Sequence, residues 1–183
     1  MKKQILLFPL LLVALIFTGC SDDDPPTPVN EEEVITTMTV TLTPSGGGTT
    51  VTLNFEDLDG DGPNAPVVSV SGNLTAGTTY SGVVKVENKT ETPAENITEE
   101  VLEEADEHQF FFTPAGGLNV STTYSDQDGD GNPLGVEFAL SANAASSGTL
   151  TVTLRHEPTK PNTGISDAGG ETDIEATFNV TVE

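Results

Sequence analysis

The stretch Ile174-Glu175-Ala176-Thr177-Phe178-Asn179-Val180-Thr181-Val182 alternates apolar and polar side chains without interruption. A period of two places all the apolar side chains on one face of an extended strand. The upstream stretch Leu150-Thr151-Val152-Thr153-Leu154 has the same pattern, with threonine on the polar face, where β-branched residues suit a half-buried sheet. These segments predict long strands that bury one face each.

The same alternation continues toward the N-terminus, over residues 34–42, 51–55, 80–86, 118–124 and 134–140. Gly46-Gly47-Gly48 predicts a hairpin between the first two of these segments. The continuous apolar runs Val67–Val70 and Phe110–Phe112 predict strands that are buried on both faces or lie at a sheet corner. The pattern therefore predicts an all-β fold, an antiparallel β-sandwich or flattened barrel of about eight or nine strands.

One segment departs from this period. Thr92-Pro93-Ala94-Glu95 has a capping residue, a proline at the first helical position and a glutamate at the third. Ile97, Val101 and Ala105 then recur every four residues. We expect one short amphipathic helix from Pro93 to about Asp106, packed across the sheet or over one end of the barrel.

The composition is strongly acidic, with 29 Asp and Glu against 6 Lys and Arg and a formal charge of −23. Such a surface excludes ordinary nucleic-acid binding, which requires basic side chains to neutralise phosphates, and it favours cations as partners. The single cysteine excludes a disulfide within the chain.

The N-terminus has the pattern of an exported lipoprotein. Two lysines precede the apolar run Ile5–Phe17, whose helical length of about 20 Å is too short to cross a bilayer. Small residues then precede the lone Cys20, as a lipoprotein signal peptidase requires; the alternative is secretion with a free thiol. We expect a signal peptide at 1–19, a lipidated Cys20 (palmitate) with an acidic, proline-rich tether at 20–33, and a single β domain at 34–183.

Two resemblances to known proteins follow. Cys20-Ser21-Asp22-Asp23-Asp24 resembles the start of Bacteroidota lipoproteins, in which acidic residues after the lipidated cysteine direct export to the cell surface. This implies a lipid anchor in the outer membrane, facing outward; anchoring in the inner leaflet, facing the periplasm, is the alternative.

The second resemblance covers nearly all of the chain after Cys20. It is to a family of small Bacteroidota surface lipoproteins labelled "type 1 periplasmic binding fold superfamily protein", whose activity is undefined. The label names a fold of two α/β lobes, whereas one helix among eight or nine strands predicts an all-β domain. The motifs that carry the resemblance are Glu31–Thr37, Asp57–Gly62, Asp106–Phe111, Leu154–Pro158 and Ala168–Glu175.

Two acidic loops are candidate calcium sites. Asp126, Asp128, Asp130 and Glu137 have the spacing of positions 1, 3, 5 and 12 of an EF-hand loop, although strands flank them; the alternative is a soluble acidic turn. The second loop carries a similar first half and is more simply a solvated turn, because its position 12 is a valine. Its candidate ligands are Asp57, Asp59 and Asp61.

The two histidines, His108 and His156, share parity with core-facing residues of their segments and stand beside carboxylates. If they meet in space they could bind zinc or copper; the alternative is two hydrogen-bonded histidines at the edge of the core. The acidic residues Glu171, Asp173 and Glu175 alternate on the outward parity of the last strand, where a solvated face is expected.

Nucleophile elbows, zinc-protease helices and phosphate loops are absent from the sequence. We therefore expect a non-catalytic, calcium-stabilised binding or accessory module at the outer membrane, with a receptor, glycan or protein ligand as its partner. The alternative is zinc or copper handling for an outer-membrane receptor through His108 and His156. A hydrolase with an unrecognised carboxylate pair is the third hypothesis.

Overall fold

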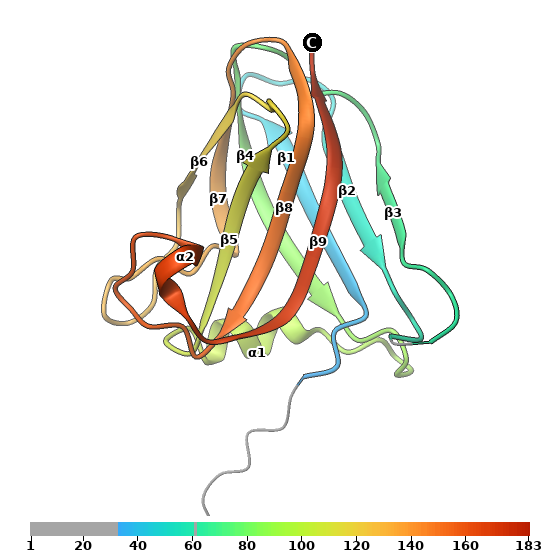
Figure 1. Ribbon diagram of the computed structural model, residues 1–183, viewed down its shortest axis with the longest axis vertical. Coiled ribbons are helices and arrows are strands. Elements are labelled where there is room, and N and C mark those ends of the chain that lie inside the picture. Colours follow the sequence, from blue (N-terminus) through green and yellow to red (C-terminus); the bar gives the residue numbers. More distant parts are fainter. Residues whose placement is uncertain (1–32, 61) are drawn as a thin grey trace, which may run out of the picture. The chain divides into compact units, whose positions relative to one another are not determined.

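The computed structural model describes residues 33–60 and 62–183 (Figure 1). The predicted signal peptide, Cys20, nearly all of the tether and Asp61 lie outside the described residues. The described part contains nine strands in two antiparallel sheets, together with two helices. Neither sheet closes on itself, so the all-β prediction is confirmed in its sandwich form. No helix of the described part has the length and apolar character needed to cross a membrane.

The larger sheet has six strands in the order β3-β2-β1-β4-β7-β6, and the smaller has three in the order β5-β8-β9. Figure 1 shows β5, β8 and β9 in front of β1, β2 and β4. The strands span β1 Thr37–Pro44, β2 Val51–Glu56, β3 Val67–Val70, β4 Thr78–Glu87, β5 His108–Ala115, β6 Val120–Tyr124, β7 Glu137–Ala142, β8 Ser146–His156 and β9 Glu171–Val182.

The core lies between the two sheets and follows the predicted alternation. Met38, Val40 and Leu42 of β1 are fully buried, and so are Leu150 and Phe178 of the smaller sheet. These side chains belong to one continuous apolar cluster, which stabilises the sandwich because it removes apolar surface of both sheets from water. The predicted hairpin at the three glycines is also present, joining β1 to β2.

The prediction for the run Val67–Val70 is wrong. These residues form β3, an edge strand paired only with β2, and the side chains of Val67 and Val68 are 63% and 43% exposed. An apolar run does not by itself distinguish a central strand from an edge strand, because that depends on which segments pair beside it.

The predicted helix exists but is shorter. Helix α1 spans Ile97–Glu103 and buries Ile97 and Val101 against the core, as the four-residue spacing predicted. It begins after Pro93 because the backbones of Asn88 and Glu95 exchange two hydrogen bonds and hold the intervening chain as a loop. A second helix, α2 (Ile165–Ala168), was not predicted.

Candidate metal centre

The two histidines lie directly opposite each other. His108 begins β5, His156 ends β8, and the antiparallel register pairs these two residues. Their rings stack with centroids 4.8 Å apart and an interplanar angle of 18°. His108 is fully buried and His156 is 9% exposed. The structure thus confirms that both side chains face the core side and shows that they meet.

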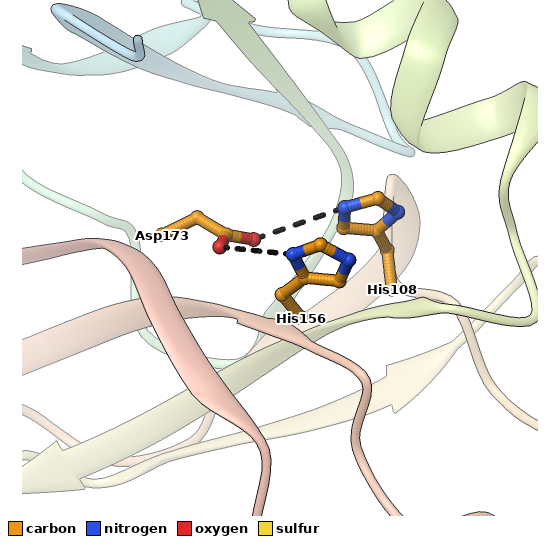
Figure 2. Close-up of side chains that lie close together, drawn as sticks. All are labelled: His108, His156 and Asp173. Atoms are coloured by element: carbon orange, nitrogen blue, oxygen red, sulfur yellow. Dashed lines mark ion pairs between the residues drawn. The ribbon is translucent and has the colours of Figure 1, made fainter. Parts of the chain in front are cut away.

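A β-bulge in β9 places a carboxylate beside the two histidine rings. The register between β8 and β9 shifts, so that Leu154 lies opposite Ile174 but Arg155 lies opposite Thr172, and Asp173 is the additional residue. Its Oδ2 atom lies 3.8 Å from Nε2 of His108 (Figure 2).

The other carboxylate oxygen of Asp173, Oδ1, lies 3.8 Å from Nδ1 of His156 (Figure 2). The prediction that Asp173 faces outward is therefore wrong, because a bulge re-aims side chains and interrupts the alternation. Its neighbours Glu171 and Glu175 are exposed, as predicted.

A second carboxylate reaches the centre from outside the smaller sheet. Glu33 lies shortly before β1, and its Oε1 atom is 3.9 Å from Nε2 of His108. The Glu33 side chain is only 15% exposed. Sequence reasoning assigned this residue to the tether and missed it, since nothing in its local sequence indicates the contact. Beside it a cavity of about 100 Å³, lined by Glu33, Glu171, Thr172 and Asp173, adjoins the carboxylates.

The hydrogen bonding of His108 leaves one ring nitrogen ready to bind a cation. Nδ1 lies 3.2 Å from the backbone carbonyl oxygen of Glu104, and a carbonyl only accepts, so Nδ1 carries the proton. Burial lowers the pKa of His108 and keeps the ring neutral, which leaves a lone pair on Nε2. Among residues 33–60 and 62–183 no hydrogen-bond partner meets Nε2.

The carboxylates around His108 repel one another. Burial, together with the negative charges of Glu100, Asp173 and Glu104, raises the pKa of Glu33 to about 7, while His156 acts in the opposite direction. The Oε2 atom of Glu33 is buried and makes no hydrogen bond with the described residues. A bound cation would neutralise this repulsion.

The arrangement fits a zinc ion. One ligand atom each from His108, His156 and Asp173 lie within 4.8 Å of one another. Zinc bonds of about 2.0–2.2 Å in a tetrahedron place ligand atoms about 3.4 Å apart, so side-chain movements of roughly half an ångström to one ångström would complete the site. The backbone carbonyl of Glu104 supplies the outer contact that orients a metal-binding imidazole.

His156 also belongs to a second group, on the other side of its ring. Its Nε2 atom lies 3.9 Å from a carboxylate oxygen of Glu107, and Glu157 is close by. Both glutamates are exposed, so water can solvate them without a metal. The buried side of the pair, toward His108 and Asp173, is the stronger candidate.

The first predicted calcium loop is closed by protein contacts. Asp128 accepts hydrogen bonds from the backbone N–H groups of Asp130 and Asn132, and the buried ammonium of Lys160 lies 3.2 Å from its Oδ2 atom. Asp126 accepts hydrogen bonds from the backbone N–H groups of Gly135 and Glu137. Lys160 thus supplies positive charge at the place where calcium was predicted.

The other two candidate ligands of that loop, Asp130 and Glu137, are exposed, and no hydrogen bond among the described residues involves their side chains. Calcium binding by this loop stays a prediction. In the second loop Asp57 accepts a hydrogen bond from the backbone of Gly60, and Asp59 accepts one from the side chain of Asn64. These contacts are those of a polar turn.

Comparisons of the chain with models of protein families, with curated proteins and with solved structures give no match.

Proposed function

We propose that this protein is a non-catalytic, lipid-anchored module that binds one zinc ion through His108, His156 and Asp173. One observation carries the proposal: the Nε2 atom of the fully buried His108 is directed at two carboxylates and has no hydrogen-bond partner among the described residues. An electron pair that faces carboxylate oxygens in a buried site is costly unless a cation lies between them.

The ligand chemistry supports a transition metal over calcium at this site. Calcium prefers six to eight oxygen ligands, whereas imidazole nitrogen suits zinc and copper. The three ligand groups His108, His156 and Asp173 converge from β5, β8 and β9, and Glu33 approaches His108 from the chain before β1, in a second group with Glu104. This matches the tetrahedral preference of zinc better than the tetragonal geometry of Cu(II).

The surroundings support binding over catalysis. His108 is fully buried, and the cavity beside the carboxylates measures about 100 Å³. Pockets for small organic ligands measure about 300–1,000 Å³. The cavity that adjoins both carboxylates has room for a metal ion and a few water molecules, whereas a second cavity of about 460 Å³ contacts Asp173 but neither histidine.

The proposed location rests on the N-terminal sequence. A lipid on Cys20 would hold the domain at the outer membrane, where a zinc-loaded module could serve as an accessory to an outer-membrane receptor. The acidic surface, with a formal charge of −23, would concentrate divalent cations near the site. Replacing Cys20 by serine should move the protein from the membrane fraction to the soluble fraction.

The test is to purify the protein and to measure bound metal by mass spectrometry, then to follow melting in EDTA, zinc, copper and calcium. We expect one zinc per chain and a melting temperature that rises with free zinc, since a ligand at 100 times its Kd stabilises by about 2.7 kcal/mol. Asp173→Asn should lose this response, whereas Asp130→Asn, the same change on an exposed side chain, should keep it. The proposal would be overturned if the wild-type protein bound neither zinc nor copper. If it bound copper tightly and no zinc, the metal assigned to the site would be copper.

A further inference from the structure

We infer that Glu33 is the fourth ligand of the zinc ion, so that metal binding fastens the chain before β1 to the smaller sheet. The inference rests on the proposed function and adds a structural consequence to it. The contact that points to it joins Oε1 of Glu33 to Nε2 of His108, over 3.9 Å.

The four ligands come from both layers of the sandwich. His108, His156 and Asp173 belong to the strands of the smaller sheet, β5, β8 and β9. Glu33 belongs to the chain that leads into β1, in the middle of the larger sheet. A metal held by all four would therefore link the two sheets at this end of the sandwich.

The backbone around Glu33 depends on side-chain contacts for its position. The first backbone hydrogen bond of this chain among the described residues is that of Thr36, whose N–H donates to the carbonyl oxygen of Glu87. Val34 is 58% exposed, while Ile35 packs against the core. A segment without backbone hydrogen bonds opens easily, so a metal–ligand bond at Glu33 should change its mobility more than that of the strands.

The burial of the Glu33 carboxylate is the second, independent observation. A glutamate next to exposed chain would ordinarily extend into water, yet this side chain is 15% exposed and its Oε2 atom has no hydrogen-bond partner among the described residues. The Oε2 atom is removed from water without a donor in return, and in the described part of the chain the carboxyl group otherwise meets the carboxyl group of Glu100 and the ring of His108, which is unfavourable unless a cation or a proton lies between them. A zinc ion shared with His108 supplies that partner.

The consequence concerns the junction with the membrane anchor. Residue 33 is where the described domain continues into the predicted tether from Cys20. Zinc bound by Glu33 would hold this first described residue of the chain against the smaller sheet.

The experiment uses the purified full-length protein in detergent, with and without zinc, and reads hydrogen exchange of the Thr36 amide, the first hydrogen-bonded amide of this segment, from overlapping peptides. We expect zinc to slow exchange there roughly tenfold or more, because opening must first break a metal–ligand bond. Glu33→Gln should abolish this protection and weaken zinc binding by roughly 10–100-fold or more, while one zinc per chain is still bound at saturation. The matched control is Glu175→Gln, the same change of charge on the outer face of β9, and it should behave as the wild type.

A second readout replaces zinc by Co²⁺, whose absorption bands report the ligand set. The spectrum should change in Glu33→Gln and not in Glu175→Gln. Unchanged protection, affinity and spectrum in Glu33→Gln would overturn the inference while leaving the proposed function standing. Absence of zinc binding in the wild-type protein would instead overturn both.

Discussion

His108 and His156 are cross-strand partners in the β5–β8 pair, with stacked rings whose centroids are 4.8 Å apart. Each ring presents one nitrogen to the same carboxylate, that of Asp173 (Figure 2). Two imidazoles directed at one buried carboxylate would form the core of the proposed metal site, and the stacking holds the two rings in place without a metal. Such preorganisation would lower the conformational cost of the proposed metal binding.

Truncating the less buried histidine should remove zinc binding and keep the fold. His156 lies at the end of β8 and is 9% exposed, whereas His108 is fully buried, so His156→Ala is the safer variant. We expect loss of tight zinc in a titration and a metal-free melting curve that remains cooperative. The control is Asp130→Asn, which should bind zinc normally. Wild-type zinc affinity in His156→Ala would contradict the site.

Glu33→Gln should stabilise the metal-free protein. The variant removes a carboxyl group whose charged form is disfavoured by burial and by the negative charges of Glu100 and Asp173, and its amide can donate a hydrogen bond to Nε2 of His108. A gain of about 1 kcal/mol is expected for such a hydrogen bond, or a rise of about 2–4 °C in melting temperature in EDTA. Glu175→Gln should show no such rise. A lower melting temperature in Glu33→Gln would mean that the carboxylate itself stabilises the domain.

Lys160→Met should be strongly destabilising. The ammonium group of Lys160 is buried, donates hydrogen bonds to the backbone carbonyls of Ala105 and His108, and pairs with Asp128. Removing one partner of a buried ion pair costs about 3–5 kcal/mol, because the remaining charge is left unpaired. Urea unfolding measures this directly.

The matched control is Lys85→Met, because Lys85 is half exposed and its pair with Glu87 lies in water. Exposed pairs contribute about 0–1 kcal/mol. If the two substitutions lowered the free energy of unfolding equally, the buried contacts of Lys160 would contribute no more to stability than an exposed ion pair.

Asp128 should contribute stability that is lost in acid. Burial alone would raise its pKa, but hydrogen bonds from Asn132 and the ammonium of Lys160 outweigh this and hold the pKa below its ordinary value. A carboxyl group whose pKa is lower in the folded state stabilises the folded protein at pH values above its pKa in the unfolded chain, about 3.9. This contribution to the free energy of unfolding disappears as the pH falls through the pKa of the folded state.

Urea unfolding between pH 6 and pH 3 should therefore show a smaller loss of stability on acidification for Asp128→Asn than for the wild-type protein. Asp130→Asn serves as the control, because its exposed side chain makes no hydrogen bond with the described residues. Parallel curves for Asp128→Asn and the wild type would contradict the assignment.

The predicted calcium loop can be tested without disturbing its structural contacts. Asp126 and Asp128 hold the loop together, so replacing them destabilises the protein whether or not calcium binds. Asp130→Asn and Glu137→Gln change exposed carboxylates and separate the two effects. If the loop binds calcium, added calcium should raise the melting temperature of the wild type and not of these variants. An unchanged wild-type melting temperature in calcium would leave the loop as a turn closed by Lys160.

Local patterns predicted the framework of the candidate site but not its ligand set. The parity of His108 with Phe110 placed it on the core side, and the structure confirms this burial. The same reasoning failed for Asp173. Strict alternation along β9 assigns this side chain to the outer face of the sheet, but the additional residue of the bulge turns it toward the histidines. Local patterns also missed Glu33, whose neighbours indicate only an acidic tether.

The sequence by itself determined the all-β class, the hairpin at the three glycines and the inward faces of the long strands, because these follow from side-chain periods within single segments. Only the tertiary structure decided that His108 meets His156, that Asp173 faces them and that Lys160 reaches Asp128. Each of these contacts joins segments far apart in the chain. Strand register and bulges depend on how whole sheets pack, which no local pattern contains.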